Sequence, residues 1–367
     1  MVKIKKLIVT LCLVIIVVGT LCAFATSQVN DGGAVPYVIS EQPQVYTTNS
    51  ENIEIGQAAD NLSAAKLLDN GIDSQLEVII PGDLDTGMQW ALASLQISEL
   101  WGIMSGGGDV VVAVLDTGID TDHEDLAGQV IGEANFTDSL TTDDIYGHGT
   151  HIAGIIAARD NDLGIIGIAP GCSLLNVKVA DDRGRCDVNS LVEGIVWAVN
   201  NGADIINISI EIKESTPDLV EAIQYAWESG ALIVAAAGNR GSQEPVYPAC
   251  YETAISVGAI TEDNKLAPLS NYGDWIDLVA PGYNIYSTSP GDTYKYESGT
   301  SFAAAHVSGI AALLFNVVVD TNDNRRINDE IQAVVEAGCK DIGITGTGEG
   351  LINALDILAQ IDQTMVH

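Results

Sequence analysis

Basic residues are scarce in this chain of 367 amino acids. Only 15 Lys and Arg residues stand against 50 Asp and Glu residues, and the formal net charge at pH 7 is -35. Neutralising nucleic-acid phosphates requires Lys and Arg, so this shortage argues against nucleic acid as a partner. The acidic balance suits bound cations or a salty environment. The many Ile and Val residues favour bound cations over extreme halophily.

Cysteine is also rare, and its spacing excludes one class of site. Two of the six cysteines lie within the first 25 residues, and the other four are Cys172, Cys186, Cys250 and Cys339. No two of these four have the close spacing of a zinc site. In an oxidising compartment four cysteines allow three pairings, and the sequence does not choose among them.

Long hydrophobic runs are absent except at the N-terminus. Three lysines precede an apolar run, Leu7–Leu21, and Ala23–Ala25 fits an A-x-A cleavage site. This pattern predicts a signal peptide over residues 1–25 and a secreted protein. The alternative is that this segment is not cleaved and anchors the protein to the outer face of a membrane. Leu7–Ala25 is nearly long enough to span a bilayer. The later apolar run Ile310–Val319 is too short for that.

The chain then changes composition twice. Residues 26–85 are polar and acidic and are interpreted as a leader or pro-segment, with a disordered spacer as the open alternative. Residues 86–360 carry the main domain, and 361–367 form a tail. No internal repeat or low-complexity segment interrupts this order.

Strands and helices alternate through the main domain. The apolar runs predict strands at 110–115, 174–179, 205–208, 232–236, 254–258 and 276–280. Helices are predicted at 149–158, 190–200, 218–228 and 303–315. This alternation predicts an α/β fold with a mostly parallel sheet covered on both faces.

Two polar motifs occur at the ends of these elements. Asp116 follows the strand at 110–115, and open α/β sheets bind ligands beyond the carboxyl ends of their strands. A turn aspartate before Gly118 is the structural alternative. His148 lies between two glycines that let another segment approach, which suits a general base. A metal site with His151 is less favoured, because no third ligand follows at a recognised spacing.

Two further motifs follow later in the chain. Asn239 comes after the strand at 232–236 and is either a turn residue or an amide directed into a site. Ser301 lies in Gly299–His306 at the start of the apolar helix. There a serine offers its hydroxyl and N–H at the positive end of the helix dipole. Serine is also a common N-cap for structural reasons alone.

Taken in order, the motifs around Asp116, His148, Asn239 and Ser301 resemble those of the subtilisin-like serine proteases. The chain order Asp, His, Ser is the subtilisin order. The resemblance implies a doubly wound, subtilisin-like α/β domain and a monomeric serine endopeptidase that acts on polypeptides. A membrane-tethered processing protease and a non-catalytic binding protein of the same fold are the alternatives.

The resemblance implies a role for each of these residues. Ser301 would attack the scissile carbonyl, His148 would take its proton, and Asp116 would orient the imidazole. The Asn239 amide and the Ser301 N–H would hold the oxyanion.

The resemblance also implies how a substrate binds. In the family the substrate backbone pairs with enzyme edge strands, and the matching residues here are Ser209, Ile210, Glu211, Ala237 and Gly238. Relatives usually carry glycine where this chain has Glu211, on the wall of the pocket for the residue before the cleaved bond. We therefore expect Glu211 to narrow that pocket or to favour a basic or polar side chain.

Calcium is the implied cofactor. The family holds Ca²⁺ with a carboxylate after the catalytic aspartate, a glutamine near the domain start and a loop that interrupts the histidine helix. The matching residues are Asp125, Gln89, the Asn161 side chain and the carbonyls of Arg159, Leu163 and Ile165. Oxygen donors of this kind suit Ca²⁺, and a solvated polar loop is the alternative. The segment Tyr247–Ala249 resembles a family segment that contains a cis peptide, so a cis bond is predicted before Pro248.

Overall fold

The computed structural model describes residues 37–38, 85–102, 104 and 107–364. The predicted signal peptide and most of the predicted leader lie outside these residues. One short strand, β1 (Tyr37–Val38), falls in the leader and pairs antiparallel with β5 (Arg185–Cys186). No helix in the described part of the chain is long and apolar enough to cross a membrane.

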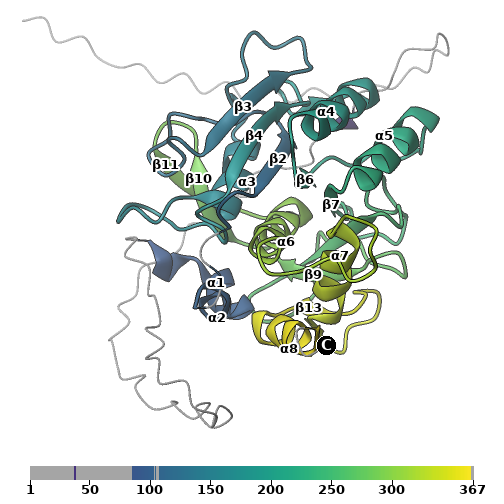
Figure 1. Ribbon diagram of the computed structural model, residues 1–367. Helices are drawn as coiled ribbons and strands as arrows, with labels where there is room; N and C mark the ends of the chain where they lie inside the picture. Colours follow the sequence, from purple (N-terminus) through teal and green to yellow (C-terminus); the bar gives the residue numbers. More distant parts are fainter. Residues whose placement is uncertain (1–36, 39–84, 103, 105–106, 365–367) are drawn as a thin grey trace, which may run out of the picture. The chain divides into compact units, whose positions relative to one another are not determined.

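A nine-stranded sheet forms the centre of the domain (Figure 1). Its strands are β2 (Val111–Asp116), β3 (Val130–Asn135), β4 (Ser173–Lys178), β6 (Ile205–Ile208), β7 (Leu232–Ala236), β8 (Ala254–Ile260), β9 (Leu278–Pro281), β12 (Cys339–Lys340) and β13 (Leu351–Ile352). Their spatial order is β12-β13-β9-β8-β7-β6-β2-β4-β3, and every neighbouring pair is parallel except β12 and β13. The prediction of a mostly parallel sheet is confirmed.

The strand order reverses beside β2. From β2 the chain continues to β3 and β4 on one side, and then passes to β6 on the other side. Such a reversal opens a crevice at the carboxyl ends of the strands, where ligands of doubly wound folds bind. Asp116 is the last residue of β2 and therefore lies at this edge.

Helices cover both faces of the sheet. They are α1 (Trp90–Leu95), α2 (Ile97–Trp101), α3 (His148–Ala157), α4 (Val188–Asn200), α5 (Pro217–Glu228), α6 (Thr300–Leu314), α7 (Asn328–Ala337) and α8 (Ala354–Thr364), together with the short 3₁₀ helix η1 (Thr86–Met88). The doubly wound arrangement is thus as predicted.

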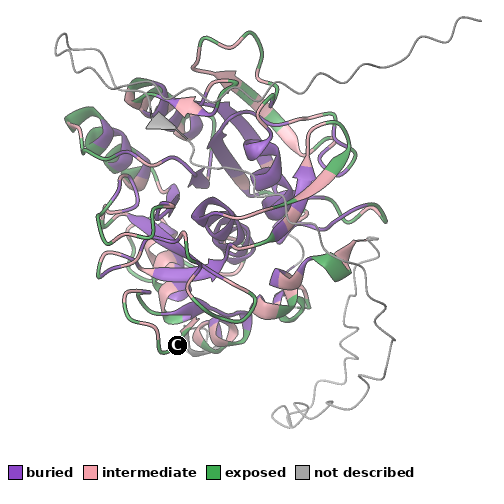
Figure 2. Ribbon diagram, turned by 180° about the vertical axis from the view of Figure 1, so that it is seen from behind, coloured by how far each residue is buried: buried purple, intermediate pink, exposed green. Residues whose placement is uncertain are grey.

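The side chains of β2 point alternately to the two faces of the sheet. Val112 and Val114 join a cluster with apolar residues of α3 and α6, whereas Ala113 and Leu115 join a second cluster with α4 and α5. Successive strand residues point to opposite faces, so one continuous apolar run fills two cores. In Figure 2 the central strands and α6 are buried along their length.

Local sequence fixes where α4 and α5 begin. The Asp187 side chain accepts the N–H groups of Asn189 and Ser190, and the Thr216 hydroxyl accepts the N–H of Leu219. These caps satisfy helix N–H groups that have no partner within the helix. Pro217 occupies the first position of α5, where a proline costs no hydrogen bond.

A hairpin that the sequence did not predict packs on α3. It consists of β10 (Ile285–Ser289) and β11 (Thr293–Glu297) and leads directly into α6. A methyl group on Gly154 of α3 would collide with the hydroxyls of Ser287 and Thr288, so only glycine lets the hairpin approach this closely. The predicted cis bond between Tyr247 and Pro248 is confirmed.

The four described cysteines are unpaired, so none of the three disulfide pairings that the sequence allows occurs in the structure. Cys172 belongs to the apolar cluster on one face of the sheet and Cys186 to the cluster on the other, which prevents a bond between these two. Burial raises the pKa of the Cys172 thiol to about 12. Such a thiol is inert at neutral pH.

Candidate active site

Asp116 and His148 meet at the carboxyl edge of the sheet. Asp116 ends β2, His148 begins α3, and Asp116 Oδ1 lies 2.8 Å from His148 Nδ1. Both side chains are 0% exposed. Asp116 Oδ1 also accepts the Thr117 N–H at 2.7 Å. With Nδ1–H donated to the carboxylate, Nε2 becomes the basic nitrogen of the neutral ring.

Ser301 begins the central helix beside this pair. It is the second residue of α6, after the N-cap Gly299, and is 2% exposed. The ring of Phe302, the next residue, lies 5.4 Å from the ring of His148. The first turn of α6 therefore adjoins the imidazole.

Phe302 also contacts the second histidine of the motif, His151. The His151 ring lies 4.6 Å from the Phe302 ring and is fully buried. Burial lowers the pKa of His151 to about 3, which keeps the ring neutral. This buried, neutral environment indicates a structural role for His151 within the core.

Asn239 is tied to the residue before Ser301. Its Oδ1 accepts the Thr300 N–H at 2.8 Å and the Thr300 hydroxyl at 3.0 Å. The same hydroxyl accepts the Gly238 N–H at 2.9 Å. These bonds orient the carboxamide by its oxygen, so the Nδ2 hydrogens are the group that Asn239 can offer to a ligand.

The predicted substrate-binding residues extend two adjacent strands. Ser209, Ile210 and Glu211 follow β6, and Ala237 and Gly238 follow its parallel neighbour β7. The structure therefore brings both segments to the edge that carries Asp116 and Asn239.

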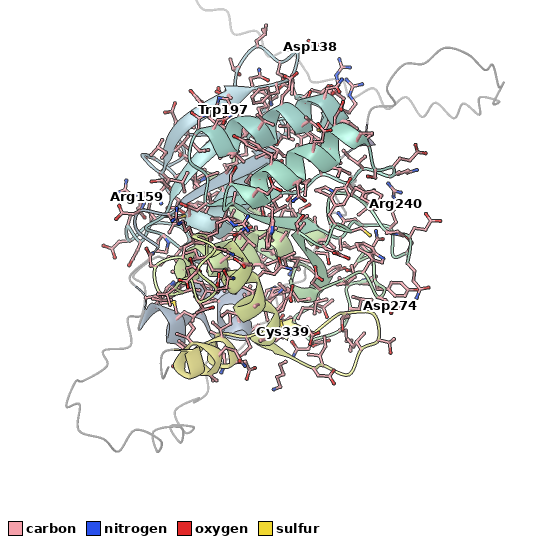
Figure 3. All side chains as sticks on the ribbon, turned by 45° about the vertical axis from the view of Figure 1, so that its right-hand side comes forward. Asp138, Arg159, Trp197, Arg240, Asp274 and Cys339 are labelled. Atoms are coloured by element: carbon pink, nitrogen blue, oxygen red, sulfur yellow. The ribbon has the colours of Figure 1, made fainter. Side chains whose placement is uncertain are left out.

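Glu211 lies against Gly238 and pairs with a residue beyond the strand. Its Oε1 forms an ion pair with Arg240, and its Oε2 is buried without a hydrogen bond. A methyl group on Gly238 would collide with Oε2. The Glu211 side chain is only 11% exposed, and Arg240 projects from the right side of the domain in Figure 3.

The predicted calcium ligands gather on a different part of the domain. Asp125 is buried, and its Oδ2 accepts the Ile165 N–H at 3.0 Å and the Tyr294 hydroxyl at 2.8 Å. The Gln89 amide bonds to both backbone groups of Ile166 at 2.8 and 3.1 Å. In Figure 3 Arg159, which begins the loop, lies on the side opposite Arg240.

These residues fit a calcium ion in their chemistry. Asp125 Oδ1 is buried without a hydrogen-bond partner, which is costly for a carboxylate oxygen unless a cation or donor meets it. The adjoining loop supplies amide and carbonyl oxygens, which Ca²⁺ prefers. Within the described residues no group of three or more His, Cys, Asp or Glu side chains could hold a metal, so the fit rests on one carboxylate and neutral oxygens.

One carboxylate that the sequence left unassigned is central here. Asp144 is buried and accepts bonds from the segment around His148. The only feature of the sequence that could have pointed to Asp144 is its position four residues before His148. Spacing alone does not reveal which donors a carboxylate meets.

Comparison with known proteins now places the chain. A family model described as the subtilase family matches residues 107–337. The chain belongs to the subtilase family. It is 41% identical over 263 residues to the thermophilic serine proteinase of Bacillus sp. (strain AK1), covering 71% of this chain and 64% of that protein.

Two further subtilases give similar matches. The chain is 39% identical over 270 residues to thermitase of Thermoactinomyces vulgaris, covering 72% of this chain and 94% of that protein. It is 44% identical over 230 residues to an intracellular serine protease of Paenibacillus polymyxa, covering 60% of this chain and 70% of that protein. These relatives support a serine-type endopeptidase.

Proposed function

We propose that this subtilase is a secreted, calcium-stabilised serine endopeptidase that cleaves polypeptides through Asp116, His148 and Ser301. The observation that carries the proposal is the 2.8 Å bond between Asp116 and His148, formed where the first turn of α6 presents Ser301. Residues 86–360 form the catalytic domain in this proposal.

His148 and Ser301 perform the proton transfer and the attack. In the neutral imidazole Nε2 takes the hydroxyl proton as Ser301 Oγ attacks the scissile carbonyl, and then passes it to the leaving amine. Asp116, buried and bonded to Nδ1, fixes the tautomer and stabilises the imidazolium. Water then hydrolyses the acyl-enzyme by the same proton path.

Asn239 and the helix start stabilise the developing charge. The Nδ2 group of Asn239 and the backbone N–H of Ser301 hold the oxyanion of the tetrahedral intermediate. Both donors are fixed before reaction, because Thr300 anchors the amide oxygen and α6 fixes the N–H. Preorganised donors require no rearrangement as the charge forms.

Calcium acts away from the chemical step. Asp125, Gln89, Asn161 and the carbonyls of Arg159, Leu163 and Ile165 would hold it. A Ca²⁺ ion bound there would neutralise the buried Asp125 carboxylate and would hold the loop that follows α3.

Glu211 sets the preference for the residue before the cleaved bond. The carboxylate lies over Gly238, within the segment proposed to bind the substrate, and its Oε2 has no hydrogen-bond donor in the structure. We expect a peptide library to show preference for basic or polar side chains, with larger apolar ones favoured in Glu211→Gly. A preference for large aromatics that does not respond to Glu211→Gly contradicts this role.

Labelling with an organophosphonate serine probe tests the function. In the presence of calcium near neutral pH, the wild type is expected to label and Ser301→Ala is not. A wild type that fails to label under these conditions contradicts the proposed activity.

N-terminal sequencing of the exported product tests localisation. A mature N-terminus beyond residue 25 supports secretion. A retained N-terminus supports the membrane-tethered alternative, and recovery only inside the cell contradicts export.

A further inference from the structure

Asp144 is the most highly bonded carboxylate near the candidate active site. It is 3% exposed and lies in the segment between β3 and α3. Its Oδ1 accepts the Thr117 hydroxyl at 2.8 Å and the Gly147 N–H at 2.7 Å. Its Oδ2 accepts the N–H of Thr150 at 2.8 Å and the hydroxyl of Thr150 at 2.7 Å.

These four bonds reach residues on both sides of the proposed catalytic pair. Thr117 follows Asp116 directly, whereas Gly147 and Thr150 flank His148 in the chain. The Thr117 hydroxyl also accepts the Gly149 N–H at 3.0 Å, so one hydroxyl joins the end of β2 to the first turn of α3. Asp144 itself touches neither Asp116 nor His148 through any of these bonds.

A buried lysine also bonds to this segment. Lys178 of β4 pairs in register with Asp116, and its Nζ donates to the carbonyl of Thr117. Lys178 also forms an ion pair with Asp182 at 3.0 Å. Thr117 is thereby bonded through its carbonyl to Lys178 and through its side chain to Asp144.

The arrangement requires acceptors at both oxygens of Asp144. Burial raises the pKa of this carboxyl group above its ordinary value, and the bonds from Thr150, Gly147 and Thr117 oppose part of that rise. All four partners donate, so a carboxamide at this position would turn its NH₂ group toward a donor pair. Two of the four bonds would then be lost, and the residues that they hold would shift.

We propose that Asp144 is a positioning residue for the proteolytic reaction, which sets the geometry between Asp116 and His148 by bonding to Thr117, Gly147 and Thr150. This inference rests on the proposed function. Proton transfer depends steeply on geometry, and a misplacement of about 1 Å can cost about 10²-fold in rate. Binding of substrate at the segments after β6 and β7 does not involve these bonds.

The test compares Asp144→Asn with Asp143→Asn. Asp143 is the exposed neighbour, so both variants remove one negative charge from the same segment. Steady-state cleavage of a fluorogenic peptide that the wild type hydrolyses gives kcat and KM, at a temperature where circular dichroism shows each variant folded. We expect Asp144→Asn to lower kcat by about 10- to 100-fold with KM changed by less than about threefold. Asp143→Asn should stay within about twofold of the wild type.

Three outcomes overturn the inference. One is an unchanged kcat in folded Asp144→Asn, and another is an equal loss in Asp143→Asn, which would indicate a general charge effect. The third concerns Thr117→Val, which keeps the Asp144 carboxylate but removes the hydroxyl that bridges it to Gly149. This variant also replaces Asp144→Asn as the test if Asp144→Asn does not fold. Its kcat should fall by about 3- to 10-fold, and an unchanged kcat contradicts positioning. Probe labelling of the wild type, measured first, separates these outcomes from a failure of the proposed activity.

Discussion

At the scale of single residues, the two bonds from Thr300 to Asn239 Oδ1 determine which part of this amide can act. We expect Asn239→Ala to lower kcat by about 10²–10³-fold, the cost typical of removing one oxyanion donor. KM should change little, because the donor contributes mainly in the transition state. Steady-state kinetics on a peptide substrate measure both values.

The matched control is Asn189→Ala. Asn189 is exposed near the start of α4, on the opposite face of the sheet from α6. Its substitution by alanine should leave kcat and KM unchanged. A rise in KM with constant kcat in Asn239→Ala would assign the amide to ground-state binding instead.

The places of residues at the ends of strands and helices were predictable from the local sequence, whereas contacts between distant segments were not. Asp116, His148, Asn239 and Ser301 each stand beside glycine or threonine at the end of a strand or the start of a helix. The ion pair of Glu211 joins it to Arg240 across two strand ends, so no local pattern could show it. Asp144 is comparable, since its donors come from positions 117 to 150.

At the scale of elements, buried parallel strands and their helices were the predictable part. β2, β6 and β7 are short apolar runs buried on both faces, and their observed bounds lie within one residue of the predicted ones. The strand β3 and the hairpin strands β10 and β11 were missed because polar residues alternate or cluster there. Strands with an exposed face give a weaker apolar signal than buried ones.

The loop between α3 and β4 provides a prediction about calcium. Adding Ca²⁺ at 100 times its dissociation constant should raise the unfolding free energy by about 2.7 kcal/mol, because only the folded protein holds the site. Asp125→Asn should abolish this gain, since it removes the only carboxylate among the proposed ligands. Thermal unfolding with and without a chelator measures the effect.

Asp160→Asn is the control within the same loop, because Asp160 is exposed and is not among the proposed ligands. It should keep the full response to Ca²⁺. Equal stabilisation of Asp125→Asn and the wild type would place the cation elsewhere in the molecule.

At the scale of the whole molecule, the α/β fold class followed from the alternation of predicted strands and helices. The division of the core into two apolar clusters did not. The two apolar clusters on either side of the sheet keep Cys172 and Cys186 apart, which a count of cysteines could not indicate. Likewise the many acidic residues predict the sign of the surface charge, whereas the burial of histidines in the core depends on tertiary packing.

Those buried histidines predict a loss of stability in mild acid. Burial lowers the pKa of His151 to about 3 and that of His306 to about 4, below the value of about 6.5 expected in an unfolded chain. Below pH 6.5 the unfolded chain therefore binds more protons, and stability falls as pH drops. The slope is roughly 1 kcal/mol per pH unit for each histidine.

Urea unfolding between pH 8 and pH 5 measures this dependence. Burial raises the pKa of Asp204 and Asp277, and these groups act in the opposite direction because they bind protons more readily when folded. His306→Gln isolates the histidine contribution, since Gln does not titrate and can still donate to the Phe302 carbonyl that lies 2.8 Å from His306 Nδ1. We expect the slope below pH 6.5 to be shallower in this variant than in the wild type. Identical slopes would show that the buried histidine ring does not exclude protons in the folded state.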